Sequence, residues 1–138
     1  MAANTSPIYS RVGDIQWGAT ALTTANTAKD GTGTVLTVFT ADATEGGRVE
    51  TITFRAAGTN VATVARVFIN NGSTNGTAAN NILYSEITLP ITTLSEVAAL
   101  TNQSITLGFA LPAGYKINCT IGTTVAAGYY ISVLGGKY

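Results

Sequence analysis

The sequence predicts an all-β, antiparallel sandwich, and three observations support this fold class. Short runs rich in Thr, Val and Ile recur along the chain, and β-branched residues favour strands. Several runs alternate polar and apolar residues, which is typical of strands with one buried face and one face in water. Clusters of Gly, Asn, Asp or Pro separate the runs, as turns require.

Eight runs qualify as strands of this sandwich. They are Gln16–Thr23, Thr34–Ala41, Gly47–Ala56, Asn60–Asn70, Ile82–Leu89, Ser104–Leu111, Tyr115–Ile121 and Tyr129–Leu134. Eight short strands separated by turns predict a jelly roll. An immunoglobulin-like sandwich is the alternative topology.

The alternation is clear in the seventh of these runs, Tyr115–Ile121. Its apolar residues Ile117 and Cys119 alternate with Asn118 and Thr120. Successive side chains of a strand point to opposite faces of the sheet. We therefore expect Ile117 and Cys119 inside the sandwich and the two polar residues on its wet face.

Two segments outside the predicted strands need separate mention: the N-terminal segment and the segment between the fifth and sixth strands. Residues 1–15 precede the first predicted strand and are expected to form an extended arm, with residues 16–138 as a single sandwich domain. In Thr93–Leu100, Ser95 can cap at most one or two helical turns. The residues that we expect to contact a partner lie in the arm and just after it: Ile8, Tyr9, Arg11 and Trp17.

Charge is scarce and balanced in this chain. Charged residues make up 10% of the sequence, and seven Lys and Arg balance seven Asp and Glu. A nucleic-acid-binding protein normally carries a basic excess, so none is predicted here. No apolar run reaches the length of a membrane-spanning helix. The segment before Pro7 lacks the features of a secretory signal, which predicts folding in a reducing cytoplasm.

Residues that could carry catalysis or bind a metal are few. The sequence contains no histidine and one cysteine, Cys119, which excludes His-based triads and His metal ligands. Asp42 with Glu45, and Glu86 with Glu96, are the acidic pairs that deserve consideration. Asp42 and Glu45 lack the oxygen-rich spacing of a calcium loop. Glu86 and Glu96 could act as a glycosidase pair only if the fold brought them together, and nothing in the sequence fixes their distance. We predict a non-enzyme without cofactor or metal, and an inert buried thiol at Cys119.

Four aromatic residues form a candidate binding group: Trp17, Tyr84, Tyr129 and Tyr130. Such rings stack against sugars in carbohydrate-binding proteins when they are exposed together. Packing in the core or at a protein interface is the simpler expectation, because aromatic side chains dominate both.

Several phrases of the sequence carry a family resemblance. In the C-terminal third, residues 111–115 read Leu-Pro-Ala-Gly-Tyr, residues 120–130 read Thr-Ile-Gly-Thr-Thr-Val-Ala-Ala-Gly-Tyr-Tyr, and residues 133–138 read Val-Leu-Gly-Gly-Lys-Tyr. Upstream, Ala-Gly-Thr-Asn-Val-Ala-Thr-Val-Ala-Arg-Val-Phe-Ile-Asn-Asn-Gly occupies residues 57–72. In style and order these phrases resemble small virion proteins of tailed bacteriophages, especially the capsid decoration (cement) proteins. The likeness covers nearly the whole chain beyond the arm.

The resemblance implies a structural protein of the virion, made in the host cytoplasm and located on the capsid exterior. Such a protein binds the major capsid protein and bridges neighbouring capsomers as a homo-dimer or homo-trimer. Two alternatives stay open: a tail or head-fibre module, and a carbohydrate-binding jelly roll used for host attachment. The last alternative predicts two or more aromatic rings exposed side by side, with Asn or Asp nearby.

Overall fold

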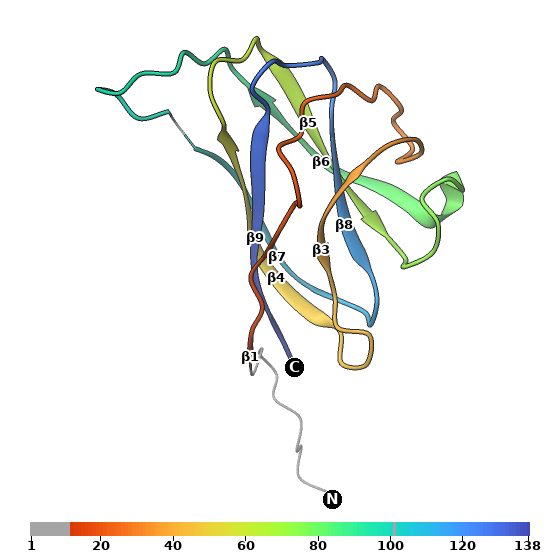
Figure 1. The fold of residues 1–138 in the computed structure, drawn as a ribbon. Helices are drawn as coiled ribbons and strands as arrows, with labels where there is room; N and C mark the ends of the chain where they lie inside the picture. The colour runs from red at the N-terminus through yellow and green to blue at the C-terminus, as the bar shows by residue number, and fades with distance from the viewer. Residues whose placement is uncertain (1–11, 101) are drawn as a thin grey trace, which may run out of the picture.

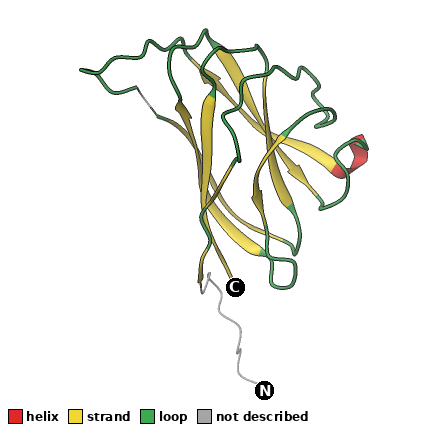
Figure 2. Ribbon diagram, viewed as in Figure 1, coloured by secondary structure: helices red, strands yellow, loops and turns green. Residues whose placement is uncertain are grey.

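The computed structural model describes residues 12–100 and 102–138 as a β-sandwich (Figures 1 and 2). Within these residues there are nine strands and one short 3-10 turn, η1 (Ala78–Asn80). The strands are β1 (Val12–Gly13), β2 (Gln16–Trp17), β3 (Leu36–Thr40), β4 (Gly47–Ala56), β5 (Thr63–Asn70), β6 (Asn81–Leu89), β7 (Gln103–Leu111), β8 (Lys116–Ile121) and β9 (Tyr129–Lys137).

The strands form two sheets, and all neighbouring strands run antiparallel. Sheet A has the order β1-β9-β4-β7, with β2 also paired to β9. Sheet B has the order β3-β8-β5-β6. The sequence prediction of an all-β antiparallel sandwich is confirmed.

The order of pairing makes the sandwich a jelly roll. The first short strands, β1 and β2, pair with the last strand, β9; β3 pairs with β8, β4 with β7 and β5 with β6. The chain is therefore arranged as one long antiparallel hairpin rolled into two sheets. In an immunoglobulin-like sandwich the last two strands lie side by side, whereas here β8 and β9 belong to different sheets.

The core lies between the two sheets and is filled by large apolar side chains. Phe39 from sheet B and Phe54 from sheet A are fully buried, and Ile52, Ile117 and Ile131 pack with them. Side chains of this size stabilise the fold by about 1.5–3 kcal/mol each when they are fully buried. The predicted interior position of Ile117 and Cys119 is confirmed.

The outer face of sheet B is also partly covered, which the alternation did not predict. Asn118 and Thr120 lie on this face, yet they are only 3% and 1% exposed. Phe68 of β5 is level with Asn118 and is fully buried on the same face. The expectation of a wet face at Asn118 and Thr120 is therefore wrong.

The cover is the segment between β2 and β3, drawn in orange in Figure 1. The N–H of Asn26 donates to the carbonyl oxygen of Ile121 at the end of β8 (2.9 Å). Farther along, the carbonyl oxygen of Asp30 accepts from Nδ2 of Asn81 at the start of β6 (3.2 Å). Because β5 lies between β8 and β6, the segment crosses the outer face of β5 and covers Phe68.

The first predicted strand is much shorter in the structure. Only Gln16 and Trp17 form β2, and Gly18 lies so close to the Leu36 side chain that a Cβ atom would clash with it. Just before, Val12–Gly13 forms β1 against β9, in the part of the chain expected to be an arm. The boundary between arm and domain stays a prediction.

Two other strand boundaries differ from the sequence prediction by three residues. β5 begins at Thr63 rather than Asn60, and β9 continues to Lys137 rather than ending at Leu134. No helix forms in Thr93–Leu100, where the Ser95 hydroxyl accepts a hydrogen bond from the Val97 N–H (3.1 Å). Among the described residues no helix is long and apolar enough to cross a membrane.

Candidate functional site

Two exposed aromatic residues lie together on the outer face of sheet A. Trp17 of β2 is level with Ser132 of β9, and Tyr130 precedes Ser132 by two residues on the same face. Diagonal neighbours of this kind are about 7–8 Å apart in an antiparallel sheet. Trp17 is 68% exposed and Tyr130 is 59% exposed. Both rings are thus available to a partner.

An arginine is fixed beside these rings. Arg55 of β4 is level with Tyr130, and its Nη1 donates to Oδ1 of Asn102 (2.9 Å) and to the carbonyl oxygen of Leu100 (3.3 Å). These hydrogen bonds hold the guanidinium at the Tyr130 end of the site. An open groove of about 400 Å³ lies here, lined by Trp17, Gly18, Thr53, Arg55, Asn102, Tyr130, Ile131 and Ser132.

The groove belongs to a longer apolar strip along β9. We define the apolar strip as Ile15, Trp17, Tyr130 and Leu134, which are all exposed. The pairing of Gln16 with Val133 sets Ile15 level with Leu134, so the strip continues on both strands. A face of this kind combines large contact area with few side chains to order on binding.

Hydroxyl-bearing residues cover the part of this face between the strip and the edge of the sheet. Thr51 is level with Thr106, and Thr53 is level with Ser104. The Thr53 and Ser104 hydroxyls are 3.3 Å apart and share a hydrogen bond. These short side chains leave the face flat and polar without charge.

Charged groups on this face lie at its ends. Nε of Arg48 is 2.6 Å from Oε1 of Glu50, and this pair is exposed to water. An exposed pair contributes only about 0–1 kcal/mol, yet it neutralises that end of the face. Arg55, at the other end, is the cation closest to the two rings.

The structure describes one of the four residues that the sequence proposed for partner binding. Trp17 lies on the exposed face, whereas Ile8, Tyr9 and Arg11 fall outside the described residues. Neither Arg55 nor Tyr130 was among the four residues predicted to contact a partner, although Tyr130 belonged to the candidate aromatic group. The alternation of polar and apolar residues in β4 and β9 was the sequence feature that indicates that both side chains are exposed.

The four aromatic residues of the candidate sugar platform do not stay together. Trp17 and Tyr130 share the groove, but Tyr129 points to the opposite face of β9 and is 2% exposed. Tyr84 lies on β6, where its ring meets Phe109 edge-on with 5.0 Å between centroids. Only two of the four rings can act as one surface.

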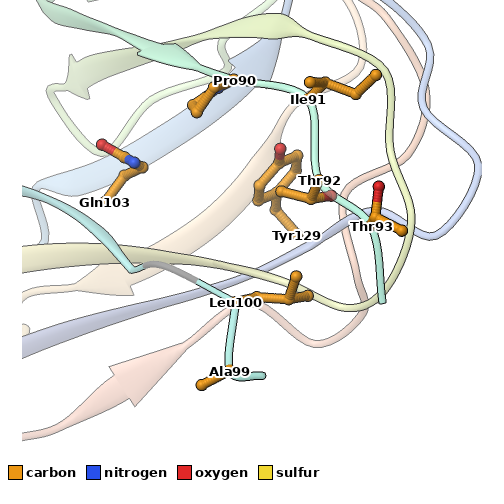
Figure 3. Close-up of a pocket in the computed structure, with 8 residues that line it drawn as sticks. All are labelled: Pro90, Ile91, Thr92, Thr93, Ala99, Leu100, Gln103 and Tyr129. Atoms are coloured by element: carbon orange, nitrogen blue, oxygen red, sulfur yellow. The ribbon is translucent and has the colours of Figure 1, made fainter. Parts of the chain in front are cut away.

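Tyr129 instead lines a small cavity under the segment between β6 and β7. Figure 3 shows its ring surrounded by Pro90, Thr92, Leu100 and Gln103. The cavity is about 170 Å³, smaller than the roughly 300–1,000 Å³ of typical ligand pockets. Burial raises the pKa of the Tyr129 hydroxyl, so it stays neutral at physiological pH. The cavity is not the candidate site.

Three of the acidic and thiol candidates, Asp42, Glu86 and Cys119, have local structural roles. The Asp42 carboxylate accepts the N–H groups of Thr44 (2.9 Å) and Glu45 (2.8 Å), which caps the turn before β4. Glu86 accepts from Nε of Arg66 (3.1 Å). Burial raises the pKa of the Cys119 thiol, so the nucleophilic thiolate is suppressed. Within the described residues, no three His, Cys, Asp or Glu side chains are grouped to hold a metal ion.

Comparison of the chain with models of protein families, with curated proteins and with solved structures found no match. The outer face of sheet A is the site that the geometry distinguishes.

Proposed function

We propose that this chain is a structural virion protein that decorates the outer surface of a tailed-phage capsid and cements neighbouring capsomers. The proposal rests on the family resemblance of the sequence and on one structural observation: Trp17, Tyr130 and Arg55 lie exposed together on the outer face of sheet A. Trp, Tyr and Arg are the residues most enriched at the energetic centres of protein interfaces.

The surroundings of these three residues suit contact with a protein. Burial of the apolar strip against a partner favours binding, because it removes apolar surface from water. The Thr and Ser side chains next to the strip can form hydrogen bonds with the partner without the desolvation cost of a charge. The balanced charge of the chain gives a broad interface little electrostatic repulsion. A shell protein of mixed surface charge is a fitting partner for this face.

The jelly roll suits the mechanical role of a cement protein. Its two sheets enclose a close-packed core, and packed cores transmit force with little deformation. A rigid body attached to two capsomers resists their separation when packaged DNA presses outward. Each contact can be weak, because many copies act on one symmetric shell.

Titration of the purified chain onto undecorated capsids tests this function. We expect saturable binding and a gain in the heat resistance of the capsids. Trp17→Ala should weaken binding about 30-fold, the effect of losing roughly 2 kcal/mol at an interface centre. Ile91→Ala removes an equally exposed apolar side chain away from this face and should bind as wild type. Absence of saturable binding would exclude the proposal.

Carbohydrate binding is a second candidate, and one observation favours it. Trp17 and Tyr130 are two exposed rings in one groove with Asn102 beside them, the arrangement that this alternative predicts. A glycan array distinguishes the candidates: strong hits that disappear in Trp17→Ala and Tyr130→Ala would support sugar binding. An empty array, together with capsid binding, would leave the protein partner as the ligand of this face.

A further inference from the structure

The two sides of the sandwich differ in how their edges are closed. On one side lie the edge strands β1, β2 and β3, and on the other lie β6 and β7. Unpaired N–H and C=O groups of an edge strand can pair with a strand from another chain. Proteins prevent such pairing with short edge strands, charges or covering groups.

The side of β2 and β3 is protected. β1 and β2 have two residues each, too few to template a strand. The side-chain amide of Gln16 hydrogen-bonds both the carbonyl oxygen and the N–H of Thr40 on β3, each at 2.9 Å. These bonds occupy backbone groups of β3 that would otherwise be open.

The side of β6 and β7 has fewer of these devices: Glu86 is the one charged residue of β6, and it is paired with Arg66 of β5. Both strands have nine residues, and among the described strands β7 pairs only with β4 and β6 only with β5. Every residue of Gln103–Leu111 is uncharged and none is proline. The side chains of Ser104 and Thr106 are exposed and small, so they leave the edge open to an approaching strand.

Bulges confine the regular part of this edge to one half of each strand. The register of β7 shifts between Thr106 and Phe109, and that of β6 shifts at Tyr84. The contact of the Tyr84 and Phe109 rings sets the two bulges level with each other. Regular segments then extend toward the same end of the sandwich: Gln103–Thr106 on β7 and Ser85–Leu89 on β6.

Apolar side chains add to the backbone groups at this side. Ile82 and Tyr84 of β6 are 64% and 43% exposed, and the Tyr84 ring contacts Phe109 of β7. Burying exposed side chains of this size favours association. Backbone pairing and apolar burial thus coincide at one side of the molecule.

We propose that this side is the self-association interface of the chain, and that its occupant is a second copy paired through β7. A two-fold axis perpendicular to sheet A sets two β7 edges antiparallel, which is the geometry of an isologous dimer. The same axis brings the two β6 strands together, because β6 lies on the same side as β7. The zero net charge of the chain removes the repulsion that keeps identical molecules apart.

The interface is tested on the purified full chain, without capsids, by sedimentation equilibrium over a range of concentrations. We expect a wild-type dimer. Thr106→Lys introduces two lysines into the paired edge and should raise the dimer dissociation constant about tenfold or more, since edge lysines block strand pairing. Thr40→Lys makes the same change on the exposed, Gln16-protected edge strand β3 and should leave the dimer unchanged.

A wild-type protein that stays monomeric, or that forms a trimer, would overturn the proposal, as would a Thr106→Lys dimer of wild-type strength. If Thr106→Lys fails to fold, amide hydrogen exchange of the wild type replaces it. The amides of Gln103–Thr106 should then become protected as concentration rises, and equal exchange at all concentrations would refute the interface. The outcome is separate from capsid docking, which uses the outer face of sheet A.

Discussion

The side-chain amide of Gln16 forms two hydrogen bonds with the backbone of Thr40, one with its carbonyl oxygen and one with its N–H, both 2.9 Å long. Gln16 belongs to sheet A and Thr40 to sheet B, so a single side chain joins the two sheets along their edges. The same amide also donates to the carboxylate of Asp14 (3.1 Å). This contact completes the edge of β3 without a further strand.

Truncation of Gln16 should loosen this edge. Gln16→Ala removes two hydrogen bonds to backbone groups near the surface, and we expect the free energy of unfolding to fall by about 1–2 kcal/mol. Denaturant unfolding measures the loss, and amide exchange at Thr40 should accelerate. Gln103→Ala is the matched control, with an expected change within about 0.5 kcal/mol. Equal losses in both variants would contradict the role of Gln16.

Asn60 should be among the most sensitive polar residues of the fold. Its buried side chain accepts the N–H groups of Ala127 (2.8 Å) and Gly128 (2.9 Å) and donates to the Gly128 carbonyl oxygen (3.0 Å). Asn60→Ala leaves these backbone groups without partners, which should cost about 3 kcal/mol. Asn71→Ala, which removes only exposed hydrogen bonds, should cost less than half as much; comparable losses would refute this assignment.

Phe68 should behave as a core residue although it lies on the outer face of sheet B. Its side chain is fully shielded from water. Phe68→Ala should lower the free energy of unfolding by about 3–5 kcal/mol. Thermal or denaturant unfolding measures this value. A loss below about 1 kcal/mol, typical of surface positions, would mean that the segment between β2 and β3 does not cover β5.

The Asp42 turn should lose its contribution in acid. The N–H groups of Glu45 and Thr44 hold the pKa of the Asp42 carboxyl below its ordinary value of 3.8. A carboxyl with a lowered folded pKa stabilises the fold above its unfolded pKa, and this stabilisation disappears as pH falls through the folded value. The stability difference between wild type and Asp42→Asn should thus be constant near neutral pH and shrink in acid. A difference that grows below pH 3.8 would contradict this account.

The sequence predicted the long strands well because their patterns are local. Gly47–Ala56 is confirmed at both ends as β4, and β7 and β8 begin within one residue of their predicted starts. Alternation specifies such strands, since one buried face repeats every second residue. The order of the strands also fits the predicted jelly roll, because eight short strands with turns between them have few compact arrangements.

The remaining features depend on contacts between distant segments. Just after β2, Gly18 lies against the Leu36 side chain, and ahead of β5 the Asn60 side chain binds the backbone of Ala127 and Gly128. Neither partner is near in sequence. In the candidate site, Trp17 could be selected as an exposed aromatic residue, but its meeting with Tyr130 and Arg55 required the pairing of β2, β9 and β4.

Imaging of intact particles at near-atomic resolution tests the central claim most directly. The account predicts this chain on the outside of the head, at joints between capsomers, with Trp17 and Tyr130 facing the shell. Particles without this chain on the capsid exterior, or with the outer face of sheet A turned toward solvent, would contradict it.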